Sequence, residues 1–267
     1  MEKQLFDKLN VEYTNYSDKE VEWLIHHIGD PNSNIRDNLV CETFGKGFLC
    51  ENFSHNQARY LIKYVLNRNL LFYNLEKTDS AILTRSFTCL LLELIIETDG
   101  DKNSKFYNIL YEKERKNIFL NLLDYLKQEH DFTSYSTDWG WVDAVSHLSD
   151  TFEVCFKHHS FPKEYGQTFL NNLMLLLLKN SNRFISGEEW RISNALFAGL
   201  KYKIFSSSDL CVWLDELKLD DRSDLIAFYQ FANLKSILLD LYIKLDNAKL
   251  LEKSLKQAIV SNYLKKY

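Results

Sequence analysis

The side chains best suited to chemistry gather in one short segment, Asp138-Trp139-Gly140-Trp141-Val142-Asp143-Ala144-Val145-Ser146-His147-Leu148-Ser149-Asp150. A helix that begins near Trp139 advances about 100° per residue, so one face of it would carry Trp139, Asp143, His147 and Asp150. The opposite, core-facing side would carry apolar residues, namely Trp141, Val145, Leu148, Phe152 and Phe156. We therefore expect the acids and the imidazole to face solvent or a groove between helices.

Five residues of this segment are the candidates for a ligand-binding site: Trp139, Trp141, Asp143, His147 and Asp150. The imidazole of His147 and the carboxylates of Asp143 and Asp150 would also be acceptable ligands for zinc, manganese or iron. The same spacing arises when a carboxylate accepts a hydrogen bond from an imidazole on a solvated helix face. A metal centre is the weakest of these interpretations, and no cofactor is expected.

An acid–base pair is the enzymatic alternative for the same segment. Asp143 could orient His147, whose unperturbed pKa of about 6.5 suits proton transfer at neutral pH. Ser146 and Ser149 point to other faces of the helix, which argues against a local triad. A hydrolase would therefore need a nucleophile from a distant part of the chain.

The tryptophans have two interpretations as well. Trp139 with Asp143 is loosely similar to the aromatic groove and single carboxylate of HEAT-like alkylpurine DNA glycosylases. The neighbourhood is acidic, however, whereas a DNA-binding groove needs a positive track for the phosphates. In the structural interpretation, Trp141 anchors the core and Trp139 packs at the end of the helix.

Length and composition favour one folded unit in a cytoplasmic protein. The 267 residues are 46% hydrophobic, which supplies ample material for a continuous core. The formal charge is -5 without a polybasic run, so neither nucleic acid nor an anionic membrane is an expected partner. No export segment opens the chain, and its apolar runs are shorter than the roughly 18 residues of a membrane span. We expect a protein, a peptide or a small ligand as the partner.

Polar residues outside the central segment are expected to be structural. The cysteines are odd in number, far apart and without a Cys-x-x-Cys pair, and are expected to be reduced core thiols: Cys41, Cys50, Cys89, Cys155 and Cys211. Arg36, Asp37 and Arg85 lie beside strongly apolar helix faces. We expect them to pair internally and to fix how neighbouring helices meet.

The pattern of the whole chain predicts helices, because only eight glycines and two prolines interrupt it. Ser17-Asp18-Lys19-Glu20 is a capping box that opens one helix, which Gly29 ends. Asp30-Pro31 then starts a helix that runs through Phe44. Further helices are predicted at 56–67, 79–98, 106–128, 139–158, 162–180, 187–204, 208–217, 223–245 and 248–263.

About eleven helices joined by short polar turns favour stacked antiparallel helix pairs over a four-helix bundle. The predicted fold class is all-α, an α-solenoid of the HEAT or armadillo sort. The predicted organisation is a single helical-repeat domain over residues 1–267. The repeat is too weakly periodic for the number of repeats to be counted.

The order of several short motifs resembles an uncharacterised bacterial family known as domain of unknown function 2785. The motifs are Gly29-Asp30-Pro31, Ile35-Arg36-Asp37, Thr84-Arg85-Ser86-Phe87, Tyr125-Leu126 and Glu129-His130-Asp131. The central match is Gly140 to Asp150, which looks like the family's Gly-Trp-x-His-Ala-x-Ala-His-x-Ala-Asp segment. The resemblance implies a fold and a cellular location more than a particular reaction.

The chain departs from that family pattern at two places. Asp143 stands where the family has its first histidine, and Thr133-Ser134 stand where an Arg-Gly pair is expected. Any role that a pair of histidines has in relatives is therefore not carried over to this chain. Two functions follow as hypotheses: a noncatalytic binding module with a groove lined by the candidate residues, or a metal- or histidine-dependent hydrolase that uses His147 with Asp143 or Asp150.

Overall fold

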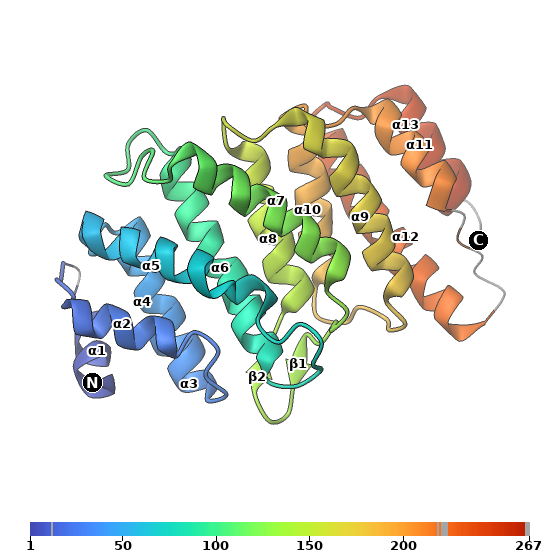
Figure 1. The fold of residues 1–267 in the computed structure, drawn as a ribbon. Coiled ribbons are helices and arrows are strands. Elements are labelled where there is room, and N and C mark those ends of the chain that lie inside the picture. Colours follow the sequence, from blue (N-terminus) through green and yellow to red (C-terminus); the bar gives the residue numbers. More distant parts are fainter. Residues whose placement is uncertain (12, 218, 220–223, 265–267) are drawn as a thin grey trace.

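Helices make up most of the described chain (Figure 1), in a computed structural model that describes residues 1–11, 13–217, 219 and 224–264. In chain order the α-helices are α1 (Glu2–Leu9), α2 (Asp18–His26), α3 (Ser33–Ile35), α4 (Glu42–Leu49), α5 (His55–Arg68), α6 (Ala81–Gly100), α7 (Glu112–Gln128), α8 (Ala144–Lys157), α9 (Gly166–Lys179), α10 (Glu188–Lys201), α11 (Ser207–Leu217), α12 (Leu225–Asn247) and α13 (Lys253–Ile259). The short elements are η1 (Arg36–Cys41), η2 (Leu70–Phe72), β1 (Tyr135–Ser136), β2 (Gly140–Trp141), η3 (Lys163–Tyr165) and η4 (Val260–Leu264). The predicted all-α class is confirmed.

The helices form two rows, and neighbours within a row are alternate helices of the chain. Row A consists of α4, α6, α8, α10 and α12, each of which packs on the next. Row B consists of α2, α5, α7, α9, α11 and α13, with η2 between α5 and α7. Row B lies in front of row A in Figure 1. Because each helix contacts the helix two places on, the face of each row is assembled from segments about 50 residues apart.

Buried side chains join successive helices of row B by donating to backbone carbonyls. Asn172 Nδ2 of α9 donates to the Leu123 carbonyl of α7 over 2.8 Å. Trp213 Nε1 of α11 donates to the Leu170 carbonyl of α9 over 2.7 Å. Each bond satisfies a polar atom that burial would otherwise leave unpaired, so the bonds fix the register of neighbouring helices at little cost.

One large apolar core runs through both rows, from Leu5 to Tyr263. The expected internal pairing of Arg85 is confirmed within this core, where its guanidinium binds Glu129 (Nε to Oε2, 2.8 Å) and both side chains are buried. Tyr125 donates its hydroxyl to the same carboxylate over 2.5 Å. A buried charge of each sign is tolerated here because both have partners.

Several predicted helix ends are confirmed by the structure. The capping box of Ser17 and Glu20 is present at the start of α2. The helix predicted after Asp30-Pro31 is present, but its middle part, η1, is a π-helix. Among the helices of the described residues, none is long and apolar enough to cross a membrane.

Other expectations about the chain are wrong, and one lies outside the described residues. The helix predicted over 139–158 begins only at Ala144, because a hairpin occupies its first residues. α1 was not predicted at all, and the predicted start of a helix at Ser223 lies outside the described residues. All five cysteines are free, but Cys50 is exposed, so it is no core thiol.

The buried hydrogen bonds between helices of row B give a direct test of this architecture. We expect Trp213→Ala to lower the free energy of unfolding by about 3–5 kcal/mol, because it empties a fully buried site and removes the hydrogen bond to the Leu170 carbonyl. Trp141→Ala, at a side chain that is 52% exposed, should cost about 1 kcal/mol or less. Urea unfolding followed by circular dichroism measures both. Equal losses in the two variants would contradict the packing described for row B.

Candidate functional site

A two-stranded hairpin carries both tryptophans of the candidate segment. Tyr135 pairs with Trp141 and Ser136 with Gly140 in an antiparallel register. Gly140 has a positive φ of 75°, which favours glycine, and Asp143 at the start of α8 also has a left-handed φ of 50°. These two conformations interrupt the predicted helix, so Trp139 and His147 do not lie on one helical face.

The two tryptophans have exchanged their expected roles. Trp139 packs against a small buried cluster that includes Ile82 and Val142. Trp141, expected in the core, is instead exposed on the outer strand and places its ring edge-on to Tyr135, with centroids 5.0 Å apart. The outward direction of Trp141 follows from the alternation of side chains along a strand, which replaces the helical period.

Arg36 holds the hairpin against the amino-terminal part of the chain. Its Nη2 donates to the carbonyls of Trp139 (2.8 Å) and Trp141 (2.9 Å), and its Nη1 donates to that of Asp30 (2.9 Å). The guanidinium is fully buried and forms the expected ion pair with Asp37 (Nε to Oδ1, 2.8 Å). Arg36 therefore determines where the start of α8 lies.

His147 faces a serine of the neighbouring helix α6, not Asp143. Ser86 Oγ donates its proton to the Val142 carbonyl over 2.5 Å and lies 2.8 Å from His147 Nδ1. Because a hydroxyl has one proton, Nδ1 must carry the hydrogen of this second bond, and Nε2 keeps its lone pair. Burial, with the charges of Arg191 and Arg36 nearby, lowers the pKa of His147 to about 3. The imidazole is thus neutral at physiological pH and too weak a base for the expected acid–base role.

Carboxyl groups from three neighbouring helices and η1 form what we call the acidic patch: Asp37, Glu93, Asp143, Asp150 and Glu188. Asp150 is buried and forms an ion pair with Arg191 of α10. Burial and the charge of Glu188 raise the pKa of Asp143 to about 6. Burial and the charge of Asp150 raise the pKa of Glu93 to about 8.

Glu93 and Asp143 have no partner of their own in the part of the chain that the structure describes. Among the residues that the structure describes, neither carboxyl group makes a hydrogen bond or an ion pair, although both are partly buried. Arg191 lowers both pKa values through its charge, but its guanidinium is bound to Asp150. The patch therefore has more carboxyl groups than cations to neutralise them.

The expected set of Asp143, His147 and Asp150 lies on α8 and at its start but does not converge. Within the described part of the chain, no three His, Cys, Asp or Glu side chains are arranged to hold a metal ion. His147 Nδ1 is bonded to Ser86 and Asp150 to Arg191. The geometry gives no support to the metal-dependent interpretation.

Five residues of the site were not among the candidates chosen from the sequence: Asp37, Ser86, Glu93, Glu188 and Arg191. Glu93 had a visible signal, since it is the one acid in the apolar stretch from Cys89 to Ile96. Asp37 was expected only in an internal pair, and Ser86 was noted only as part of a family motif. Nothing in the sequence indicated Glu188 or Arg191, because only the packing of α6, α8 and α10 brings these residues to the site.

Removing the Arg36 guanidinium should uncouple the hairpin. We expect Arg36→Met to lower the free energy of unfolding by about 3–5 kcal/mol, because two hairpin carbonyls and Asp37 lose their buried partner. Arg36→Lys should retain only part of the lost stability, since an ammonium cannot reproduce the planar set of donors of a guanidinium. Arg68→Met, at an exposed arginine, is the control and should change stability by less than about 0.5 kcal/mol. Urea unfolding and proteolysis of the hairpin provide the measurements, and an unchanged midpoint for Arg36→Met would disprove this role.

The acidic patch should make stability fall as the pH rises. The folded state holds a proton on Glu93 up to about pH 8, whereas the unfolded chain releases it near its ordinary pKa. His147, whose pKa is lowered to about 3, opposes this loss up to about pH 6.5, so wild-type stability should decrease between about pH 6.5 and pH 8. Glu93→Gln should remove this loss and be more stable than wild type above pH 8 by up to about 4 kcal/mol.

Urea unfolding at a series of pH values tests whether stability falls as the pH rises. Asp99 and Glu129 do not interfere, because partners hold their pKa values below the usual range and their contributions are complete above about pH 4.5. Glu216→Gln, at an exposed acid of α11, should keep the wild-type slope. A Glu93→Gln variant with the wild-type slope would show that Glu93 is ionised like a surface acid.

Comparison with known proteins identifies a family but no activity. Comparisons with curated proteins and with solved structures gave no match. Residues 71–243 match the family described as "Protein of unknown function (DUF2785)", which confirms the resemblance noted from the motifs. These residues include α6, α8 and α10, which carry most of the acidic patch. The chain therefore belongs to the DUF2785 family.

Proposed function

We propose that this chain is a noncatalytic binding module whose acidic patch holds a cationic segment of a peptide or protein. In this proposal residues 1–267 form one helical-repeat domain, an α-solenoid of the HEAT or armadillo sort. The two rows support it, because most helices pack on the helix two places on and so repeat one helix-pair unit along the chain.

The observation that carries the proposal is the pair of unpartnered carboxyl groups, Glu93 and Asp143. In the folded chain Glu93 lies near Asp150, and Asp143 lies near Glu188 and Asp150. The raised pKa values of Glu93 and Asp143 mean that ionising either group in this place costs free energy. A lysine or arginine side chain from a partner would supply the missing positive charge and allow both groups to ionise. Binding would then release protons, which couples affinity to pH.

Apolar surface borders the acidic patch and fits the remainder of a basic segment. Trp190 is 50% exposed, and the Arg191 guanidinium lies 4.8 Å from the centroid of its ring. Lys244 of α12, the next helix of row A, donates to the Trp190 carbonyl over 3.2 Å, and its neighbour Ile243 is also half exposed. Such a surface can pack against the aliphatic stems of lysine and arginine while the patch receives their charges.

The catalytic alternative has less support from the same geometry. Ser86 supplies the hydroxyl that contacts the imidazole of His147, but it is fully buried and its proton is already donated to the Val142 carbonyl. A serine nucleophile must be reachable by substrate and must pass its proton to a base of suitable pKa. Neither condition is met, so hydrolysis is not proposed, and the acidic surroundings argue equally against a DNA glycosylase.

The test uses a fluorescein-labelled peptide in which lysine and arginine alternate with glycine and leucine. Anisotropy titration should show affinity that is about tenfold tighter at pH 8 than at pH 5.5, because Asp143 and Glu93 ionise across this range. The double variant Glu93→Gln with Asp143→Asn should bind at least about tenfold more weakly at pH 8 and lose most of the pH dependence.

Glu216→Gln is the matched control for a lost carboxylate. It lies on α11 of row B and should bind the peptide as the wild type does. Circular dichroism confirms that each variant is folded. The proposal fails if the double variant binds like the wild type, or if Glu216→Gln weakens binding as much as the double variant does.

A further inference from the structure

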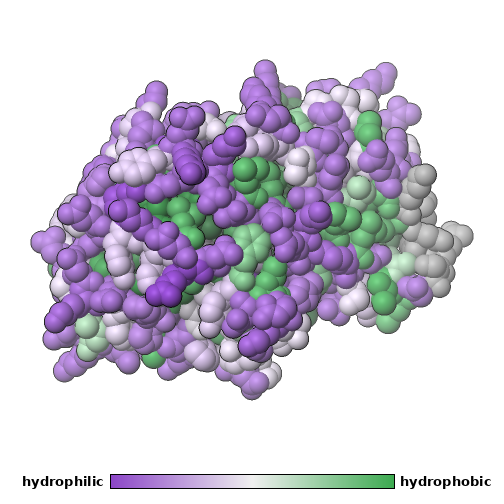
Figure 2. Space-filling model, viewed as in Figure 1, coloured by the Kyte–Doolittle hydropathy of each residue, from purple (hydrophilic) through white to green (hydrophobic). Residues whose placement is uncertain are grey.

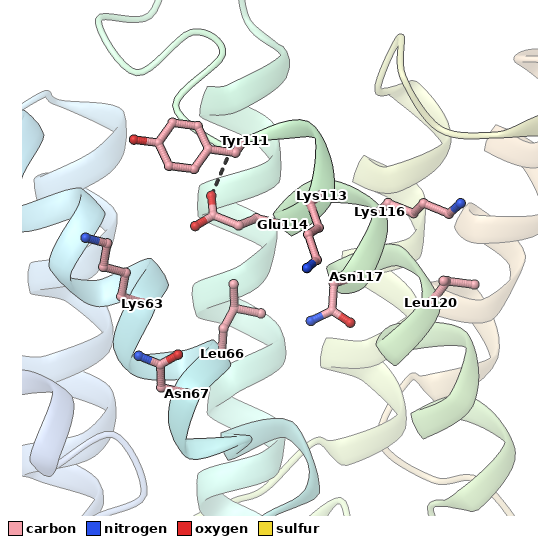
Figure 3. A pocket seen from close by; sticks show the side chains of 9 residues that line it. All are labelled: Lys63, Leu66, Asn67, Tyr111, Lys113, Glu114, Lys116, Asn117 and Leu120. Atoms are coloured by element: carbon pink, nitrogen blue, oxygen red, sulfur yellow. Dashed lines mark hydrogen bonds between the residues drawn. The ribbon is translucent and has the colours of Figure 1, made fainter.

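An open groove lies on the other side of the molecule, between α5 and α7 of row B (Figure 3). Its volume is about 630 Å³. The side chains that line it come from the two helices and from Tyr111 at the start of α7: Lys63, Leu66, Asn67, Tyr111, Lys113, Glu114, Lys116, Asn117 and Leu120. Figure 2 shows this face, on which hydrophilic residues predominate and hydrophobic ones appear between them.

The groove exists because α7 packs closely on α9 but only loosely on α5. η2 lies between α5 and α7 at one end and contacts both helices. Near the other end, Arg59 of α5 binds Glu114 of α7 with two bonds of 2.7 and 2.8 Å, and its Nη1 also donates to the Ile109 carbonyl. The two helices are therefore held apart along their middle parts.

The groove carries a net positive charge, because its acid is already paired and its lysines are not. Glu114 is the one acid of the lining, and its carboxylate accepts hydrogen bonds from Arg59 and from the Tyr111 backbone. In the described structure Lys63, Lys113 and Lys116 make no hydrogen bond or ion pair. Lys116 also lines a neighbouring hollow, but there Arg115 is paired with Asp99 and two acids, Glu112 and Glu164, are present, so the positive charge is confined to the groove.

The rest of the lining is suited to a peptide. Leu66 and Leu120 provide apolar surface on the two sides, and the ring of Tyr111 is 66% exposed. The amides of Asn67 and Asn117 offer both donors and acceptors, as a peptide backbone requires. A groove between two helices, with apolar anchors and charges at its edges, matches the recognition of an amphipathic segment.

We propose that the α5–α7 groove binds an acidic amphipathic segment of a partner protein, with its apolar side chains on Leu66 and Leu120 and its carboxylates at Lys63, Lys113 and Lys116. A nucleic acid fits less well, because the chain carries a net charge of -5 and the positive charge is confined to this region. The groove lies in row B and the acidic patch in row A, so this proposal does not depend on the function proposed above.

The experiment uses a fluorescein-labelled peptide in which glutamates flank leucines at helical spacing. At low salt the full chain should bind it with a Kd of about 10–100 μM, and at about 0.3 M salt the affinity should fall several-fold. Lys63→Glu with Lys113→Glu should weaken binding at least about tenfold. Leu120→Gln, which changes no charge, should weaken it by about threefold or more.

Lys253→Glu, on α13 at the far end of the molecule (Figure 1), is the control for reversing a lysine charge away from the groove and should bind as the wild type does. Circular dichroism again verifies that the variants are folded. A single-stranded oligonucleotide of equal charge serves as the competitor. Loss of binding in Lys253→Glu equal to that in the groove variant, no effect of Leu120→Gln, or tighter binding of the oligonucleotide would each overturn the proposal.

Discussion

The guanidinium of Arg36 is the interaction on which the rest of the candidate site depends. It is fully buried and binds carbonyls at Trp139 and Trp141, the first of them 103 residues away in the chain. Removing a charged group from water is costly, and here Asp37 and three backbone carbonyls compensate for that cost. Because these partners come from two distant segments, the ion can be satisfied only when the hairpin is docked on the amino-terminal helices.

Docking of the hairpin has consequences for the helix that follows it. Asp143 takes a left-handed conformation immediately before α8, and His147 is then directed to Ser86 on α6. The positive charge of Arg36 also contributes to the low pKa of His147. One buried arginine thus affects both the geometry and the protonation of the residue that seemed most suited to catalysis.

The acids of this protein fall into two electrostatic classes. Asp99 and Glu129 are buried with full sets of partners: Asp99 accepts from Arg115 and His158, and Glu129 accepts from Arg85 and Tyr125. Burial alone would raise their pKa values, but these bonds outweigh it and lower them. Glu93 and Asp143 lack such bonds, and their pKa values are raised. Structural acids are thus neutralised within the fold, whereas the two unpartnered acids are the ones for which an external cation would be favourable.

Surface charge is divided between the two rows in a corresponding way. In row A the acidic patch has an excess of carboxyl groups, and in row B the groove has an excess of lysines because Arg59 already neutralises Glu114. A chain with a small net charge can therefore present two local surfaces of opposite sign.

The sequence by itself determined the all-α class, most helix positions, the capping box at Ser17 and the internal pairing of Arg36 and Arg85. These features depend on local spacing, on capping chemistry and on the cost of leaving a charge unpaired in an apolar surrounding, all of which can be read along the chain. Tertiary structure alone decided that Trp139 and Trp141 belong to a hairpin, since the bonds that stabilise it come from Arg36. It also decided that His147 meets Ser86 and that Glu93 lies near Asp150, because those pairs are 61 and 57 residues apart and only helix packing brings them together.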